Sequence, residues 1–279
     1  MYFNKYMNKI FKLFKSSPHS SLKWDNYFEI YEASLKKFIN KKVTLVEIGV
    51  GNGGSLFMWK KFLGSKAKII GIDLNPDAKK FEKFGFKIFI GDQADPNFWK
   101  KFYIKNGKID ILIDDGGHTN LQQITALMES IENIKNDGLI LIEDTHTSFM
   151  NYKGFKNPSD YSLINFTNKI IENLHRRNPM IKKKMNLFSK KIASIEYFDS
   201  IVIIKISKKN YSYCKNLHNN KKLNPFFTDY RFKRTIIKKS NNNKIPLLSY
   251  IKSKISKKGF LQGIYENHLI KKYLDKLNN

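Results

Sequence analysis

EIGVGNGGS, residues 47–55, is the stretch that decides the fold. It follows the apolar run TLV at 44–46 and leads into the helix-like run LFMWKKFL at 56–63. Gly49, Gly51 and Gly54 have the spacing G-x-G-x-x-G, which lets a backbone loop approach a nucleotide-like ligand closely. By itself this spacing is compatible with NAD, a nucleoside phosphate or S-adenosylmethionine. The segment has no P-loop lysine, which disfavours ATP hydrolysis.

Outward from this loop, short apolar segments alternate with helix-like segments. The predicted strands are 44–49, 67–73, 86–92, 109–115 and 137–144. The predicted helices are 22–39, 55–64, 75–85, 95–103, 121–135 and 161–177. Two apolar runs within 191–208, split by Asp199 and Ser200, predict a β-hairpin. The order predicts an α/β, Rossmann-like fold with a seven-stranded, mostly parallel sheet and a C-terminal antiparallel hairpin.

The chain divides into three parts by pattern. Residues 1–40 are an expected N-terminal helical segment. Tyr27 and Tyr31 lie on its apolar helical stripe, which begins at Trp24, and this favours core packing over the alternative of substrate contact. Residues 41–209 hold the β/α alternation. Residues 210–279 have no clear period and are an expected basic C-terminal extension.

The charge of the chain is large and uneven. Its formal net charge is +27 over 279 residues. Residues 1–150 carry 22 Lys and Arg against 17 Asp and Glu, whereas residues 151–279 carry 29 against 7. Such a surface attracts polyanions such as nucleic acid, anionic lipid or phosphorylated small molecules, although a coding bias toward lysine and asparagine produces the same composition.

The number of cysteines and the length of the apolar runs indicate the cellular compartment of the protein. Cys214 has no second cysteine to pair with, which fits a reducing cytoplasm. No apolar run approaches the length of a membrane span, and the basic N-terminus lacks the pattern of a secretory signal. We therefore expect a cytoplasmic protein without a membrane span.

Acidic residues stand at the ends of all five predicted parallel strands, where open α/β sheets bind their ligands. They are Glu47, Asp73, Asp92, Asp114, Asp115, Glu143 and Asp144. Asp73 is placed to accept hydrogen bonds from ribose hydroxyls, which fits NAD and S-adenosylmethionine equally. Asp92, with Gln93 beside it, is placed to contact an adenine amino group.

Three features favour S-adenosylmethionine over NAD, and the place of Asp92 for an adenine amino group is one of them. Glu47 precedes the glycines in an E-x-G-x-G pattern, where its charge can order the loop and favour a sulfonium ligand. The terminal hairpin is typical of methyltransferases rather than dehydrogenases. Ser55 either contacts the cofactor carboxylate or caps its helix. The predicted cofactor site comprises Glu47, Gly49, Gly51, Ser55, Asp73, Asp92, Gln93 and Asp114.

Six segments together resemble the class I S-adenosylmethionine-dependent sugar O-methyltransferases of the mycinamicin and macrocin type. They are EIGVGNGGSLFMW, GIDLN, GDQADPNFW, IDDGGH, LIEDTHTSF and IEYFDSIVIIK. The resemblance runs from about Trp24 to Lys209, and the basic tail lies outside it. The same motifs are similar to those of bacterial methyltransferases that act on heptoses of capsular polysaccharide.

This resemblance implies a Mg²⁺-dependent transfer of a methyl group to a sugar hydroxyl. By resemblance, Asp115, Glu143 and Asp144 would hold the metal and His118 would be the general base. Gly117 stands where family members often carry serine. The implied acceptor is a nucleotide-linked, lipid-linked or polysaccharide sugar, and a homo-oligomer is expected because related enzymes often associate. A metal and a base would both help, since a sugar hydroxyl is protonated at neutral pH.

Several alternatives stay open from the sequence. His118 could instead cap the following helix, and His146 could line the substrate site or be structural. The run His175-Arg176-Arg177 could bind a diphosphate or simply end a helix. An RNA or other nucleic-acid methyltransferase is the alternative function, disfavoured because the chain has no N-P-P-Y motif and no catalytic cysteine motif around Cys214. A non-catalytic, cofactor-binding scaffold is the third.

Overall fold

The computed structural model of the chain describes residues 8–152, 155–156 and 162–217. The chain divides into two compact units, Met1–Asn216 and Leu217–Asn279. Most of the expected basic extension therefore lies outside the described residues. Among the described residues, no helix is both long enough and apolar enough to cross a membrane.

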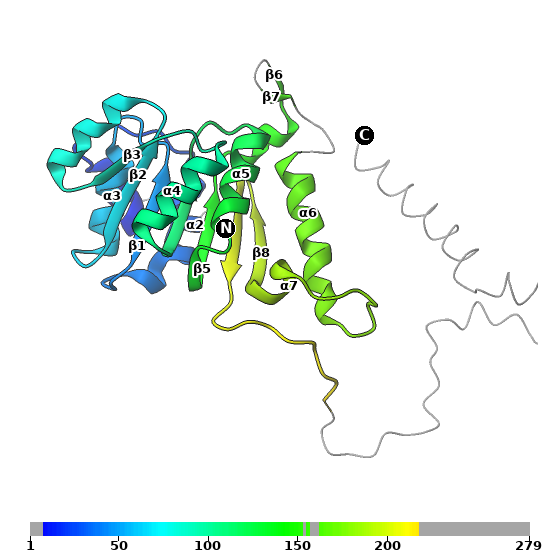
Figure 1. Ribbon diagram of the computed structural model, residues 1–279. Coiled ribbons are helices and arrows are strands. Elements are labelled where there is room, and N and C mark those ends of the chain that lie inside the picture. The colour runs from blue at the N-terminus through cyan, green and yellow to red at the C-terminus, as the bar shows by residue number, and fades with distance from the viewer. Residues whose placement is uncertain (1–7, 153–154, 157–161, 218–279) are drawn as a thin grey trace, which may run out of the picture. The chain divides into compact units, whose positions relative to one another are not determined.

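A seven-stranded sheet forms the centre of the first unit (Figure 1). Its spatial order is β3-β2-β1-β4-β5-β9-β8. The strands are β1 Thr44–Ile48, β2 Lys68–Asp73, β3 Lys87–Ile90, β4 Ile109–Asp114, β5 Ile134–Ile142, β8 Ile192–Phe198 and β9 Ile201–Ile206. The first five are parallel, β9 is antiparallel to β5, and β8 is antiparallel to β9. This confirms the predicted fold class, including the C-terminal hairpin.

Helices cover both faces of the sheet. One apolar cluster joins the sheet to α1 Lys9–Lys15, α2 Tyr27–Leu35, η2 Lys36–Phe38, α3 Gly54–Leu63 and η3 Pro76–Phe84. A second cluster joins the other face to α4 Pro96–Asn106, α5 Asn120–Ser130, α6 Leu163–Leu174 and α7 Leu187–Lys191. The short elements are η4 Thr145–Phe149, η5 His175–Arg177 and the pair β6 Asn151–Tyr152 and β7 Phe155–Lys156. The result is three layers, as continuous apolar parallel strands require.

Side chains alternate between the two faces along the central strands. Leu45, Ile113 and Leu141 belong to the cluster under α1–α3. The adjacent apolar residues belong to the cluster under α4–α6, and they are Val46, Leu112, Ile140 and Ile142. Glu47 pairs in register with Ile113, and Ile113 pairs with Leu141. By the same alternation, Glu47 lies on the α1–α3 face. Asp115 and Glu143, two positions beyond Ile113 and Leu141, lie on that face as well.

The expected helix at 22–39 is shorter than predicted. Helix α2 begins at Tyr27, and residues 22–26 form a non-helical segment. Tyr31 is buried, which confirms its assignment to core packing, and Tyr27 is buried as well but donates its hydroxyl hydrogen bond to Asp144. Trp24 does not belong to the buried stripe, because it precedes the helix and is 58% exposed.

The expected helix at 121–135 is also too long. Helix α5 ends at Ser130, and β5 begins at Ile134 rather than at 137. Ile134 pairs with Ile109, and the register then shifts before Leu139 pairs with Ile111. Asp137, with φ +66, lies within this irregularity. Pairing with β4 therefore overrides the local helical pattern.

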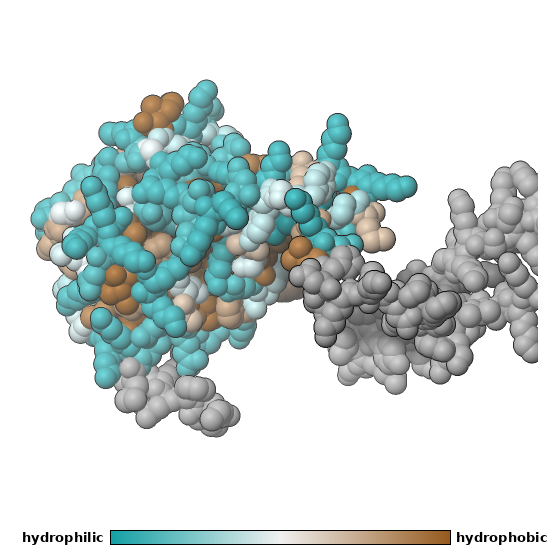
Figure 2. Space-filling view, turned by 90° about the horizontal axis from the view of Figure 1, so that it is seen from below, coloured by the Kyte–Doolittle hydropathy of each residue, from teal (hydrophilic) through white to brown (hydrophobic). Residues whose placement is uncertain are grey.

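The surface fits the composition. Seen from below in Figure 2, the described part is largely hydrophilic, and its hydrophobic residues form small separate areas. Scattered apolar residues of this kind are ordinary on a protein surface. The features that position chemistry lie instead at the carboxyl ends of the parallel strands.

Candidate functional site

The glycine loop after β1 lies against the loop after β4. Gly49 has φ +87, and a Cβ at this position would lie 2.0 Å from the Asp115 carbonyl oxygen. Gly51 has φ +50 and faces open space. Asp73 Oδ2 accepts hydrogen bonds from the amides of Val50 (2.9 Å) and Gly51 (3.0 Å). Asp73 therefore helps to order this loop.

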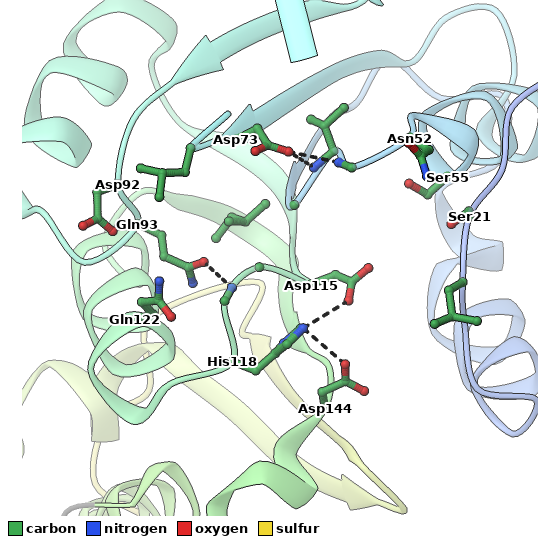
Figure 3. A pocket seen from close by; sticks show the side chains of 18 of the residues that line it. Ser21, Asn52, Ser55, Asp73, Asp92, Gln93, Asp115, His118, Gln122 and Asp144 are labelled. Atoms are coloured by element: carbon green, nitrogen blue, oxygen red, sulfur yellow. Dashed lines mark hydrogen bonds and ion pairs between the residues drawn. The ribbon is translucent and has the colours of Figure 1, made fainter. Parts of the chain in front are cut away.

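A cavity of about 660 Å³ opens above the loop, at the carboxyl ends of β1–β4 (Figure 3). It is lined by six of the residues predicted for the cofactor: Gly49, Gly51, Ser55, Asp73, Asp92 and Gln93. The N-terminal segment at 20–22 forms another part of its wall. Ser17 Oγ donates to the Gly54 carbonyl (2.8 Å), which ties this segment to the start of α3.

Glu47 and Asp114, which were also predicted for the cofactor site, do not line this cavity. Glu47 accepts hydrogen bonds from Ser55 Oγ (2.8 Å) and Trp59 Nε1 (2.9 Å). Asp114 accepts from Gln93 Nε2 (3.0 Å). Burial raises the pKa of Glu47 to about 7 and that of Asp114 to about 6. Both residues therefore orient side chains that line the cavity.

A second cavity, of about 320 Å³, lies next to the first. Leu22, Asp115, His118 and Asp144 line both cavities, and we call these four residues the shared wall. The rest of the smaller cavity is lined by Lys23, Trp24, Tyr27, Glu143, His146, Thr147 and Met150. Two ligands bound in the two cavities would thus meet at the shared wall.

The polar side chains of the shared wall are close enough to act together. His118 Nε2 lies 3.3 Å from Asp144 Oδ2 and 4.0 Å from Asp115 Oδ1 (Figure 3). His118 has φ +56 and Asp144 has φ +53, values that non-glycine residues adopt at a cost of roughly 1–3 kcal/mol. Tyr27 Oη donates to Asp144 Oδ1 (2.6 Å), and Trp24 Nε1 donates to the same oxygen (3.1 Å). These bonds fix the carboxylate.

The donor set of the shared wall fits a divalent cation. Asp115, His118 and Asp144 each offer a ligand atom, and these atoms lie within 4.8 Å of one another. Carboxylate oxygens are the ligands that Mg²⁺ prefers in proteins. His118 Nδ1 is buried and has no hydrogen-bond partner among the described residues. The structure does not place Glu143 in this group, and its expected role as a third metal ligand stays a prediction.

Sequence reasoning missed Lys23, which comes from the non-helical segment before α2. Its side chain is 1% exposed, and Nζ lies 2.8 Å from Glu143 Oε2. Burial would lower the pKa of Lys23, but Asp115, Glu143 and Glu47 outweigh burial and hold it well above its ordinary value. Burial and the neighbouring Asp115 raise the pKa of Glu143. Strand alternation predicts that the three acids share a face, but no local pattern marks Lys23 as their partner.

Two groups left open by the sequence have definite places. His146 lines the smaller cavity, and its Nδ1 lies 3.1 Å from Ser200 Oγ. Arg177 Nε donates to the Ser189 carbonyl (2.7 Å), and its guanidinium lies 3.7 Å from the centre of the Tyr211 ring. Arg177 therefore ties α6 to the chain around α7. This supports a structural role over diphosphate binding.

The strand order, with its antiparallel terminal pair, and the cavity at the strand ends define the class I methyltransferase fold. The MycE methyltransferase of the mycinamycin pathway, solved in complex with Mg and SAH, aligns with a TM-score of 0.62 and 22% identity over 72% of this chain and 53% of that one. No known protein-family profile matches the chain.

The chain also matches curated O-methyltransferases in sequence. An 8-demethyl-8-alpha-L-rhamnosyl tetracenomycin-C 2'-O-methyltransferase of Streptomyces olivaceus is 30% identical over 56% of this chain and 44% of its own length. A mycinamicin VI 2''-O-methyltransferase of Micromonospora griseorubida is 32% identical over 47% of this chain and 33% of its own. The chain thus spans less than half the length of these relatives.

Proposed function

We propose that this chain is an S-adenosylmethionine-dependent O-methyltransferase that methylates a hydroxyl group of a sugar. The observation that carries the proposal is the meeting of two cavities at Asp115, His118 and Asp144. The methyl donor binds in the larger cavity, beside the glycine loop and Asp73. The acceptor enters the smaller one, so that its hydroxyl reaches the methyl group across the shared wall. The sugar-linked names of the relatives support this assignment.

His118 acts as the general base of this proposal. The acceptor oxygen forms a bond to the methyl carbon as the carbon–sulfur bond breaks, and the hydroxyl proton moves to His118 Nε2. Once the proton is on Nε2, Asp144 Oδ2, 3.3 Å from that nitrogen, stabilises the imidazolium. Asp115, Glu143 and Asp144 would hold Mg²⁺, and the bound ion would lower the proton affinity of an acceptor hydroxyl.

The charges of the cavities favour a sugar over a nucleic acid. The smaller cavity, which receives the acceptor, is lined by three acids, Asp115, Glu143 and Asp144, against one lysine, Lys23, which already pairs with Asp115 and Glu143. Such a lining repels a phosphate backbone but suits a neutral polyol. From the resemblance, the acceptor is a nucleotide-linked or polysaccharide sugar such as a capsular heptose. The basic residues of 151–279 keep a nucleic-acid methyltransferase as the competing function.

The test is transfer of label from methyl-labelled S-adenosylmethionine to a panel of sugar nucleotides, oligosaccharides and an RNA oligonucleotide. We expect transfer to a sugar and its loss in excess EDTA. Transfer to RNA alone would move the assignment to nucleic acid. Full transfer in EDTA would remove the metal from the proposal.

His118→Ala tests the base directly. We expect S-adenosylhomocysteine binding within about twofold of wild type, and turnover lower by about 10²–10⁴-fold because proton removal is lost. His175→Ala is the matched control, since His175 is exposed and lines neither cavity. Wild-type turnover in His118→Ala would contradict the assignment of the base.

A further inference from the structure

Three carboxylates converge on one buried lysine at the α1–α3 face of the sheet. Lys23 Nζ lies 2.5 Å from Asp115 Oδ2, 2.8 Å from Glu143 Oε2 and 3.9 Å from Glu47 Oε1. The side chains of Lys23 and Glu143 are 1% exposed and that of Glu47 is 0% exposed. We call Glu47, Asp115 and Glu143 the inner acids.

The inner acids need a positive charge close by. Buried carboxylates lose their hydration, and breaking a buried ion pair by removing one partner is strongly destabilising. Within the described part of the chain, Lys23 is the Lys or Arg that forms ion pairs with these three acids. Its ammonium therefore neutralises much of the negative charge of the inner acids while no divalent ion is bound.

Lys23 engages only one oxygen of each of two acids. It holds Asp115 Oδ2 and Glu143 Oε2, whereas Asp115 Oδ1 is directed to the side of His118, 4.0 Å from Nε2. Glu143 Oε1 is buried and has no hydrogen-bond partner among the described residues. Asp115 can therefore be shared, with the lysine at Oδ2 and a divalent ion at Oδ1.

We infer that Lys23 is a built-in cation that keeps the inner acids assembled when no divalent ion is bound. It is a positioning residue, because it acts on the acceptor site only through Asp115 and Glu143. The fold then needs no metal to form, and the site is ready for one. Only the identity of the divalent ion rests on the proposed function.

The test compares thermal unfolding of full-length wild type and Lys23→Met in EDTA and in saturating MgCl₂, at matched ionic strength. We expect Lys23→Met to unfold about 5–15 °C below wild type in EDTA, because the inner acids lose their counter-charge. Mg²⁺ should restore at least half of this loss by supplying the missing charge. Wild type should shift by less than a third as much between the two conditions.

Two further variants complete the comparison. Lys37→Met removes an exposed ion pair with Asp137 (2.9 Å) and should respond to Mg²⁺ as wild type does. If Lys23→Met does not fold, Lys23→Met/Glu143→Gln is compared with Glu143→Gln, and the double variant should gain more from Mg²⁺.

Equal responses of the lysine variant and its reference to Mg²⁺ and EDTA would overturn the inference and leave Lys23 a simple structural ion pair. Calorimetric titration with Mg²⁺ gives a second readout, in which Lys23→Met binds at least as tightly as wild type. Weaker binding would also overturn the inference. Absence of methyl transfer by wild type, together with the larger response of Lys23→Met, would remove the proposed function and leave the role of Lys23 standing.

Discussion

At the scale of single residues, Glu47 is an acid buried in an apolar layer with two hydrogen-bond donors. Ser55 Oγ and Trp59 Nε1 satisfy its two oxygens. Burial raises the pKa of Glu47 from its ordinary 4.5 to about 7, although Lys23 and Trp59 act in the opposite direction. The folded protein therefore binds a proton at Glu47 more tightly than the unfolded chain does.

This raised pKa predicts a dependence of stability on pH. Tighter proton binding at Glu47 stabilises the folded state at low pH. This contribution to the free energy of unfolding is lost as pH rises from about 4.5 through about 7, so wild type loses stability relative to Glu47→Gln. The change is on the order of 3 kcal/mol. Gln fits the site because the Ser55 hydroxyl can accept as well as donate. Urea unfolding of both proteins in EDTA at pH 4.5, 6 and 8 measures it, and a difference independent of pH would contradict it.

The residues of the site were predicted unevenly, for physical reasons. Acids at the ends of parallel strands must gather at one edge, so Asp73, Asp92 and Asp115 could be placed from the sequence. The division between Asp114 and Asp115 follows from strand alternation, which sends neighbouring side chains to opposite faces. Lys23 could not be found, because its partners come from three strands and its own segment has no period.

At the scale of elements, α5 places His118 by the way the helix begins. Thr119 is the N-cap, and its side chain and that of Gln122 form a capping box. His118 immediately precedes this cap, and its carbonyl accepts a hydrogen bond from Thr147 Oγ1 (2.9 Å). The first turn of α5 and η4 together therefore hold the histidine in its left-handed conformation.

Thr119→Ala should lower both stability and turnover. Loss of the cap costs about 1 kcal/mol of unfolding free energy, and the histidine loses one of its two anchors. Ser162→Ala is the matched control, because Ser162 caps α6 in the same way (Oγ to the Asn165 amide, 3.3 Å) without lining either cavity. Chemical denaturation and methyl-transfer assays separate the two effects. Equal turnover in the two variants would show that the cap serves stability alone.

Elements were predicted well where local pattern and pairing agree. The glycine loop, Asn75 before Pro76, and the split at Asp199 all mark ends that the structure keeps. The end of α5 was misplaced because Ile131 and Ile134 continue its apolar helical spacing in the sequence. Both are buried, but Ile131 directly follows α5 and Ile134 begins β5. Only the neighbouring strand β4 decides that Ile134 belongs to the sheet.

At the scale of the whole molecule, both cavities lie within the unit Met1–Asn216. Residues 217–279 carry 15 Lys and Arg against 3 Asp and Glu, so they hold +12 of the net +27. A chain ending at Asn216 should fold and bind S-adenosylhomocysteine with a Kd within about threefold of the full chain at matched salt, since screening removes the long-range part of the difference. Calorimetry measures this. Loss of binding at every salt concentration would mean that the second unit contributes directly to the site.

The pairing of β5 with β9 also has a consequence for the nascent chain, because β9 is synthesised long after β5. Leu139, Ile140, Leu141 and Ile142 form a wholly apolar run, and in the described part of the chain its outer edge is covered by Val202–Lys205. Residues 143–200 must leave the ribosome before that cover exists. During this interval the nascent chain presents an unprotected, aggregation-prone edge at the centre of its future sheet. Formation of the hairpin thus also covers the edge that the nascent chain had left exposed.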